Sequence, residues 1–165
     1  TGFVGFAANP ETKELYIFCE FCRTRMLNCD IAEEIKKLGY AKERIRADCA
    51  EPKSNDDLRR LGITRIVPSV KGRDSILNGI AAISEYRITV HPDCVNMIRE
   101  LSSYVYDDRT NERGQRLPKD SDNHLCDALR YAFEDVKHFH PRKEEKPVYR
   151  TAEIGGADLN GGWDV

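Results

Sequence analysis

The sequence predicts an α/β fold, and three observations lead to this prediction. Apolar, β-branched or aromatic segments typical of strands alternate along the chain with amphipathic segments typical of helices. Of the 165 residues, 40% are hydrophobic and 33% are charged, which suits one soluble domain with its own core. No stretch approaches the roughly 20 consecutive apolar residues that a membrane-spanning helix requires.

The first fifty residues are predicted to contribute three strands. Phe3 to Asn9 is small and apolar, and Glu14 to Cys22 is rich in Tyr, Ile and Phe, so both segments are typical of strands. Asn9 and Pro10 favour a turn between them, which makes the two strands antiparallel. Ile45 to Ala50 predicts a third, shorter strand.

A helix is predicted between the second and third of these strands. Ile31, Ile35 and Leu38 are spaced four and three residues apart with charged residues between them, which is the pattern of an amphipathic helix. Asp30 is expected to cap the start of this helix, and Gly39 is expected to end it.

The rest of the chain continues the alternation and ends in a polar tail. Asp107 to Lys119, rich in Arg, Asp and Asn, predicts an excursion or a mobile hairpin. Residues 1–138 are the predicted domain, and residues 139–165, with four glycines and mixed charges, are the predicted flexible tail. We expect strands over Ile63 to Val70 and Arg87 to His91, and helices over Asn55 to Leu61, Asp74 to Tyr86, Cys94 to Tyr106 and Asn123 to Lys137.

Composition and motifs argue against several classes of function. The 26 Lys and Arg residues against 28 Asp and Glu residues give a net charge of −2, so any contact with nucleic acid must use a local basic patch. The six cysteines are interpreted as reduced thiols, and the single pair Cys19 and Cys22 lies on a predicted strand, where a zinc site is disfavoured. The absence of a P-loop, of a dinucleotide-binding glycine motif and of a serine nucleophile elbow disfavours nucleotide hydrolysis and serine-hydrolase chemistry.

Asp48 is the first candidate site residue. It follows a predicted strand at the point where the chain enters a loop, and in α/β sheets such strand ends face ligands. The alternative interpretation is a turn aspartate that accepts a hydrogen bond from its own loop backbone.

His124 and Asp127 form the second candidate group. They lie three residues apart on a predicted helix and therefore project from one face of it. The alternative interpretation is purely structural, with Asp122 as the N-cap, His124 on the surface and Asp127 as a favourable charge in the first turn.

Lys71 and Arg73 form the third candidate group. They flank Gly72 between a predicted strand and a predicted helix, where cations and free helical N–H groups together suit a phosphate. The alternative interpretation is a capped helix with two solvated basic residues.

In their order along the chain, these segments resemble the C-terminal nuclease domain of tailed-phage terminase large subunits. The resemblance runs from roughly Gly2 to Val136. It implies a ribonuclease H-like fold, a mixed central sheet flanked by helices, and a metal-dependent endonuclease that cuts concatemeric viral DNA during genome packaging. The matching segments are Ala47 to Lys53, Lys71 to Ile76 and Asp122 to Tyr131.

The resemblance also implies roles for particular residues. Asp48 matches an acidic metal ligand, and His124 with Asp127 matches the imidazole and acidic pair on the last helix, so these three are the predicted catalytic and metal-binding residues. These residues would bind two divalent cations, Mg²⁺ or Mn²⁺, which supply the chemistry that phosphodiester hydrolysis requires. Lys53, Lys71 and Arg73 are the residues predicted to bind DNA.

One feature departs from the family pattern. Such domains open with a central strand that carries a first catalytic aspartate, whereas Thr1 to Cys29 contains no aspartate. Gly2 to Ala8 resembles the second strand of the fold, so the first strand is expected upstream of Thr1. Glu20 is the less favoured substitute, and an inactive relative is the less favoured explanation.

Partners and location follow from the resemblance alone. It implies an ATPase domain upstream in the same polypeptide, a small terminase subunit, a portal and double-stranded viral DNA as partners, no membrane, and a place in the cytoplasm of the bacterial host. Two other functions stay open: another ribonuclease H-like enzyme, such as a resolvase or transposase core, and a non-catalytic module that docks on a portal.

Overall fold

In a computed structural model of the protein, two small groups of strands lie between two layers of helices. The structure describes residues 1–50, 52–70, 72 and 74–137. Its elements, in chain order, are β1 (Gly2–Asn9), β2 (Glu14–Cys22), α1 (Asn28–Lys37), β3 (Ile45–Ala47), α2 (Pro52–Arg60), β4 (Ile66–Pro68), α3 (Ser75–Ser84), β5 (Arg87–Val90), α4 (Val95–Ser103), β6 (Tyr106–Thr110), β7 (Arg116–Pro118), α5 (His124–Ala132) and α6 (Glu134–Lys137).

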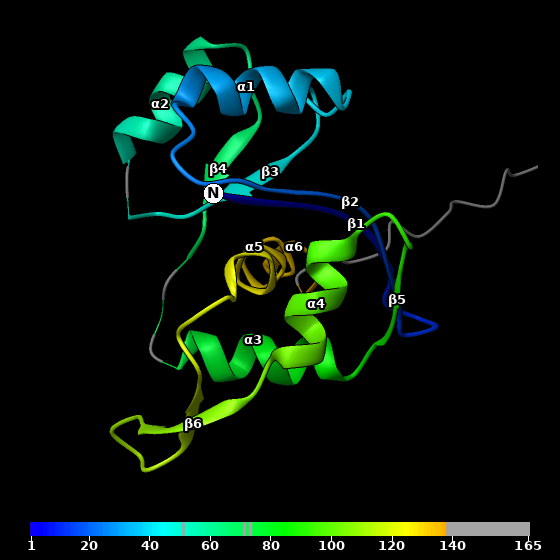
Figure 1. The fold of residues 1–165 in the computed structure, drawn as a ribbon, viewed down its shortest axis with the longest axis vertical. Coiled ribbons are helices and arrows are strands. Elements are labelled where there is room, and N and C mark those ends of the chain that lie inside the picture. Colours follow the sequence, from blue (N-terminus) through cyan, green and yellow to red (C-terminus); the bar gives the residue numbers. More distant parts are fainter. Residues whose placement is uncertain (51, 71, 73, 138–165) are drawn as a thin grey trace, which may run out of the picture.

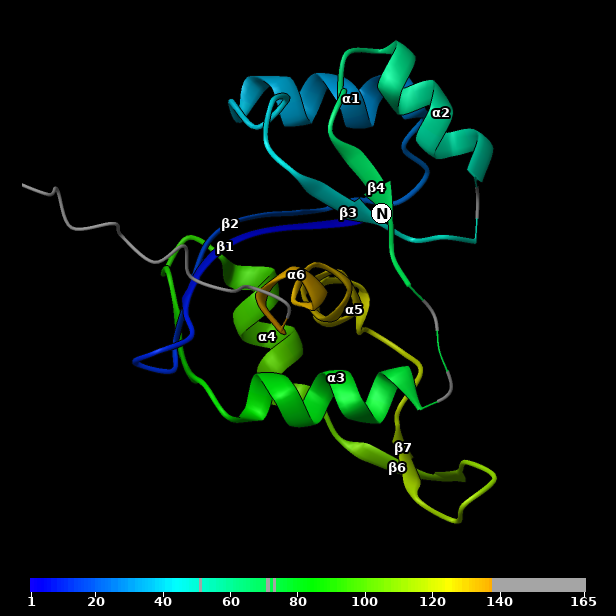
Figure 2. The same ribbon diagram turned by 180° about the vertical axis from the view of Figure 1, so that it is seen from behind.

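The two layers of helices lie on opposite sides of the strands. Helices α1 and α2 cover one side, and α3, α4, α5 and α6 cover the other (Figure 1). The same separation holds from behind (Figure 2). None of the helices within the described residues has the length and apolar character needed to cross a lipid bilayer.

The strands pair in the mixed arrangement that the sequence predicts. Strand β1 is antiparallel to β2, and β2 is parallel to β5, which gives the order β1-β2-β5. Strands β3 and β4 form a separate parallel pair. Among the described residues, β1 therefore pairs only along its β2 side and β3 only along its β4 side.

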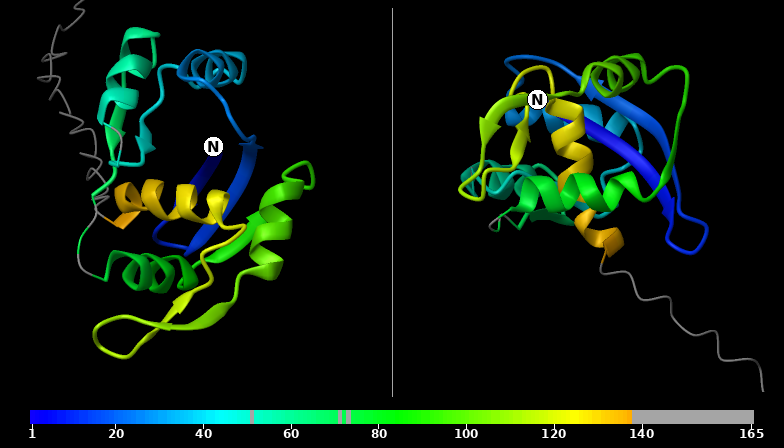
Figure 3. Two further views of the ribbon diagram at one scale, coloured as in Figure 1. Left: turned by 60° about the vertical axis from the view of Figure 1, so that its left-hand side comes forward. Right: turned by 90° about the horizontal axis from the view of Figure 1, so that it is seen from below.

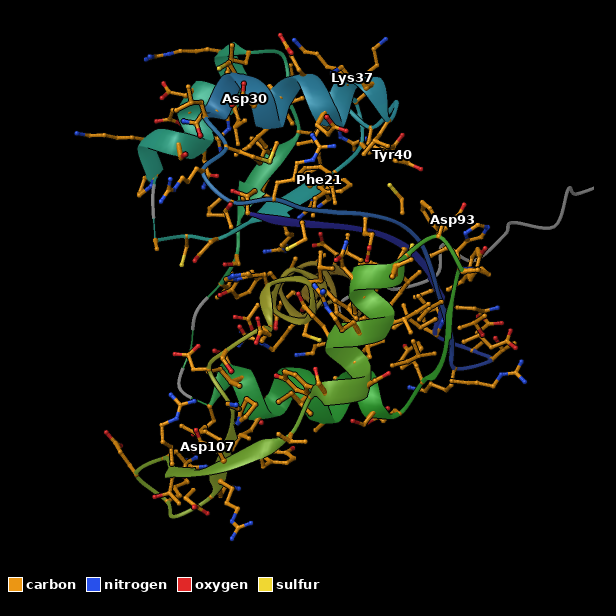
Figure 4. The ribbon with its side chains drawn as sticks, viewed as in Figure 1. Phe21, Asp30, Lys37, Tyr40, Asp93 and Asp107 are labelled. Atoms are coloured by element: carbon orange, nitrogen blue, oxygen red, sulfur yellow. The ribbon has the colours of Figure 1, made fainter. Side chains whose placement is uncertain are left out.

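Strand β2 contributes to both hydrophobic cores, and a bulge decides which of its residues face each core. Gly5 and Phe6 are consecutive residues of β1, but they pair with Cys19 and Ile17, which leaves Phe18 without an opposite residue. An extra residue of this kind inverts the alternation of side chains beyond it. Ile17 consequently faces α4 and α5, whereas Phe21 faces α1 and α2, the side on which Figure 4 shows it together with Tyr40.

The two cores lie on opposite sides of the strands, as three-layer packing requires. The core beneath α1 and α2 is built from Phe21, Ala32, Ile35, Leu58, Ile63 and Ile66. The core above α4 and α5 is built from Val4, Leu15, Ile17, Cys94, Met97, Leu125, Cys126, Leu129 and Phe133.

Most predicted elements are present, although several bounds differ. Strand β3 ends at Ala47, three residues early, because the side chain of Asp48 accepts the backbone N–H of Ala50 and turns the chain. Helix α2 begins at Pro52, three residues early, since proline suits the first position of a helix. Strand β4 covers only Ile66–Pro68 of the longer strand predicted there.

The first helix and the last helix also differ from the prediction. Asp30 lies in the first turn of α1 rather than before it, and it caps the helix by accepting the backbone N–H of Leu27 at 2.9 Å. The single predicted final helix is interrupted at Phe133, whose buried ring packs edge-on against Tyr86 at 5.0 Å between ring centroids. The segment after α4 forms the predicted hairpin, β6 with β7, which projects away from the strands (Figure 3).

Helix α5 approaches β1 closely at Gly2. A Cβ atom added there would lie 2.9 Å from the carbonyl oxygen of His124 and 3.0 Å from the carbonyl carbon. Only a glycine therefore lets the start of β1 touch the first turn of α5 without displacing it.

An ion pair connects β3 with α6. Arg46 and Arg44 donate to opposite oxygens of Asp135, at 2.6 Å and 2.9 Å respectively. Burial works against ionisation of Asp135, but the hydrogen bonds from Arg46 and Arg44 outweigh it and hold the pKa of this carboxyl below its usual range.

Substitution of Gly2 by Ala is expected to lower the free energy of unfolding by about 1–3 kcal/mol, because the added methyl group must push the backbone of His124 away. Gly72→Ala is the matched control, since a Cβ at Gly72 meets no atom within 4 Å. Urea denaturation of both variants measures the difference. Equal stability of the two variants would contradict the close approach.

Asp135→Asn is expected to destabilise the protein by about 1–3 kcal/mol at neutral pH, since it removes a charged acceptor from two arginines. A carboxyl whose folded pKa is lowered contributes stability above its unfolded pKa of about 3.9 and loses that contribution as the pH falls through the folded value. The deficit of the variant should therefore shrink below about pH 4. Denaturation midpoints across pH, with the exposed Asp93→Asn as control, measure this; a deficit that is constant with pH is the opposing result.

Candidate metal centre

Asp48 lies where the chain leaves β3, at the strand end that the sequence predicts, and it also forms the turn of the alternative interpretation. Its side chain is exposed, and its Oδ1 atom accepts the backbone N–H of Ala50 at 3.1 Å. The buried side chain of Asn55 donates to the backbone carbonyl of Asp48 at 3.3 Å and ties this turn to α2. Asp48 is therefore a turn aspartate held at a strand end.

His124 and Asp127 share the first turn of α5, as their spacing predicts. Leu125, Cys126 and Leu129 are buried and anchor the helix, while His124 is exposed and Asp127 is partly buried. The predicted N-cap is wrong by one residue: Asn123 occupies that position, and Asp122 has a φ of 51° in the left-handed region.

Arg130 holds the carboxylate of Asp127 from within the helix. Its Nη2 atom donates to Asp127 Oδ1 at 2.8 Å, and only 7% of the residue is exposed. The aliphatic part of Arg130 lies against α3, where a Cβ added to Gly79 would be only 2.5 Å from Cγ. Burial alone would lower the pKa of Arg130, but the hydrogen bond to Asp127 outweighs it and raises the pKa of this guanidinium above its usual range.

Arg130 is not among the site residues predicted from the sequence, although a local signal for it is present. An arginine three residues after an aspartate lies on the same face of a helix and is within reach of an ion pair. The spacing does not reveal that Arg130 is buried against a second helix at Gly79.

The three predicted metal-binding residues line one pocket. Asp48 comes from the end of β3, and His124 and Asp127 come from the start of α5. The cavity measures about 380 Å³, which is enough for two cations with several waters, since each water occupies about 30 Å³ in the liquid. Its other polar lining residues include Thr1, Ser54, Asn55 and Tyr131.

The donor chemistry of this pocket fits a divalent cation, but the ligand set is incomplete. Two carboxylates and an imidazole are the donors that Mg²⁺ and Mn²⁺ accept. Within the part of the chain that the structure describes, no three His, Cys, Asp or Glu side chains gather closely enough to hold a metal ion by themselves. Asp48, His124 and Asp127 line the same pocket, but a cation bound there would need further ligands.

A second pocket separates β1 from β3. Val4, Phe6 and Ala8 line it from β1, and Ile45 and Arg46 line it from β3. Ala128 and Ala132 of α5 close one side. The two strand edges that lack a described partner thus face the same space, directly beside the pocket that contains Asp48.

Two other groups near Asp127 are held in their protonated forms. Burial, followed by the charges of Glu100 and Asp127, raises the pKa of Cys126 to about 12. Burial and the charge of Asp127 likewise raise the pKa of Tyr104 to about 12. Neither group is therefore ionised near neutral pH, which removes both as nucleophiles or general bases for this site.

The remaining site predictions have different outcomes. Lys53 is described and lies exposed on the first turn of α2, whereas Lys71, Arg73 and residues 138–165, which include the predicted tail, lie outside the described residues. Glu20 lies outside the pocket and accepts the backbone N–H groups of Asn96 and Met97 at 2.8 Å and 2.6 Å, so it caps α4.

Comparisons with known proteins agree with this architecture. The family described as Terminase RNAseH like domain matches residues 1–135. The chain is 34% identical over 141 residues to the terminase large subunit of Bacillus phage SPP1, and 32% identical over 138 residues to the PBSX phage terminase large subunit of Bacillus subtilis. These alignments cover 82% and 81% of this chain but only 33% and 31% of those proteins, so the chain spans about a third of their length.

Solved structures show the same fold. The crystal structure of the SPP1 g2p (large terminase) nuclease domain with bound Mn matches with a TM-score of 0.73 and 32% identity, over 82% of this chain and 78% of that one. The large terminase of a thermophilic bacteriophage matches with a TM-score of 0.64 and 22% identity, over 82% of this chain and 36% of that one, which supports the fold alone. With a family match that extends from β1 through α5 and into α6, the chain belongs to the ribonuclease H-like domains of terminases.

Proposed function

We propose that this chain is the nuclease domain of a phage or prophage terminase large subunit and that it cuts concatemeric viral DNA during packaging. The observation that carries the proposal is the convergence of Asp48, His124 and Asp127 on one pocket from distant parts of the chain. The similarity to a terminase nuclease domain whose crystal structure contains Mn supports it.

Three residues of the pocket would bind the two divalent cations. Asp48 and Asp127 offer carboxylate oxygens, and the imidazole of His124 favours Mn²⁺ over Mg²⁺. Bound there, the cations would make a water nucleophilic and stabilise the charge on the leaving 3′ oxygen. Arg130 keeps Asp127 Oδ1 occupied and so directs the carboxylate toward the pocket in one orientation.

We further propose that a strand from upstream in the same polypeptide lies between β1 and β3 and brings another carboxylate next to Asp48. The edges of β1 and β3 that lack a described partner face one apolar space. Their backbone N–H and C=O groups would be satisfied most simply by pairing with a strand between them. An additional ligand from that strand would also complete the donor set that Asp48, His124 and Asp127 leave unfinished.

Three basic residues are proposed to contact the DNA. Lys53 lies exposed close behind Asp48 in the chain, and Lys71 and Arg73 are assigned the same role from the sequence. The net charge of −2 gives little long-range attraction for DNA, which suits a nuclease that receives its substrate from an ATPase domain, a small subunit and a portal in the host cytoplasm.

The proposal predicts metal-dependent nicking of plasmid DNA by the chain extended upstream by one strand. Mn²⁺ or Mg²⁺ should support cleavage, and EDTA should abolish it. Asp48→Asn and Asp127→Asn should each reduce the initial rate by about 100-fold or more, because each removes a charged metal ligand. Asp120→Asn is the control, since this exposed carboxylate does not line the pocket and should keep the parent rate.

Four results would count against parts of this account. Cleavage that survives both pocket substitutions would contradict the assigned site. Strong Mn²⁺-dependent cleavage by residues 1–165 alone would contradict the need for an inserted strand. No cleavage by any form, together with portal binding that survives Asp48→Asn and Asp127→Asn, would favour a docking module, and a preference for branched DNA would favour a resolvase.

A further inference from the structure

Glu100 contacts the helix that carries the candidate ligands, although it lies on a different helix and outside the pocket. It belongs to α4, only 4% of it is exposed, and its Oε2 atom accepts the backbone N–H of Leu125 at 2.8 Å and that of Cys126 at 3.1 Å. Leu125 and Cys126 are the two residues between His124 and Asp127. A single carboxylate oxygen thus fixes the backbone that joins the two candidate ligands.

The first turn of α5 depends on this contact because it has no local cap. The first N–H groups of a helix lack partners within the helix, and a side chain at the N-cap usually accepts one of them. Asn123 occupies the N-cap of α5 but makes no side-chain cap hydrogen bond. Glu100 performs this task from α4, and its negative charge also complements the positive end of the helix dipole.

Burial makes the contact specific as well as favourable. A carboxylate removed from water loses its hydration, and it is stable in the interior only if hydrogen bonds replace the lost waters. Backbone N–H groups provide them here, and such charge-assisted bonds are about twice as strong as neutral ones. Rotation of the first turn of α5 would break both bonds at once, so few alternative orientations remain.

We propose that Glu100 is a positioning residue for metal binding, which acts by fixing the first turn of α5 so that His124 and Asp127 point into the pocket together. This inference rests on the proposed metal site. Arg130 orients the side chain of Asp127, whereas Glu100 orients the backbone beneath both ligands. Removal of Glu100 should therefore spread the ligands over several orientations and weaken metal binding.

Glu20 provides a matched control within the same fold. It too accepts two adjacent backbone N–H groups, those of Asn96 and Met97, at the start of a helix. Glu20 does not line the pocket, and its helix, α4, carries no candidate ligand. Helix α4 does carry Glu100, but Glu100 lies three residues beyond Met97 and is expected to keep its own bonds to Leu125 and Cys126 when Glu20 is lost. Loss of either carboxylate should cost similar stability, but only loss of Glu100 should affect metal binding.

The test measures Mn²⁺ affinity by electron paramagnetic resonance and amide hydrogen exchange of the metal-free protein, in the chain extended upstream by one strand. Glu100→Ala should weaken Mn²⁺ binding by about tenfold, the usual effect of losing a residue that supports a ligand. It should also accelerate exchange at Leu125 and Cys126. Glu100→Gln keeps an acceptor oxygen and should restore affinity to within about threefold of the parent.

The control separates positioning from general stability. Glu20→Ala should accelerate exchange at Asn96 and Met97 and leave Mn²⁺ affinity within about twofold of the parent. Equal affinity in Glu100→Ala and the parent, or equal losses in Glu100→Ala and Glu20→Ala, would overturn the inference.

Three further outcomes are also decisive. If Glu100→Ala does not fold, Glu100→Asp replaces it, because it keeps the charge but shortens its reach; its affinity must then fall below that of Glu100→Gln, and the reverse order would overturn the inference. If the parent binds no Mn²⁺, the proposed metal site fails, and this inference fails with it. Unchanged exchange at Leu125 and Cys126 in Glu100→Ala would instead contradict the positioning role alone.

Discussion

Packing of α5 against both groups of strands is the constraint on which the candidate site depends. Asp48 follows β3, and Gly2 opens β1 in the other group of strands; Asp48 lines the same pocket as the first turn of α5, and Gly2 approaches that turn closely. Buried Leu125 and Leu129 hold α5 beneath β1 and β2, and Gly2 permits contact without a gap. The ion pair of Arg46 with Asp135 fixes the following helix, α6, to β3. The pocket therefore keeps its shape although β1 and β3, both within the described part of the chain, do not pair with each other.

The acidic residues of this chain are separated into structural and candidate functional groups by their partners. Glu20 and Glu100 accept adjacent backbone N–H groups at the starts of two helices. Asp48 and Asp127 instead line an open pocket. The carboxylates of the two helix caps accept backbone N–H groups of neighbouring helices. Asp48 and Asp127 also accept hydrogen bonds, from Ala50 N–H and from Arg130, but they border the pocket as well. Carboxylates therefore have two roles in this fold: two of them cap helices, and two others line the pocket.

Local patterns were sufficient to predict much of the fold. Alternating apolar residues identified β1 and β2, and the spacing of Ile31, Ile35 and Leu38 identified α1. The bulge at Phe18 could not be predicted, because it exists only in the pairing of two strands. For the same reason the interruption at Phe133, which packs against a distant aromatic ring, was missed. The convergence of Asp48, His124 and Asp127 came from the family resemblance, whereas the support from Glu100 and Gly79 is tertiary and leaves no local signal.

The central claim is that Asp48 and the first turn of α5 hold divalent cations between them. Anomalous diffraction at the manganese edge, from crystals of the upstream-extended chain grown with Mn²⁺, tests it most directly. The account predicts anomalous peaks in the pocket, in direct contact with carboxylate oxygens of both Asp48 and Asp127 and with the imidazole of His124. Peaks that contact neither carboxylate, or an empty pocket at saturating Mn²⁺, would contradict it.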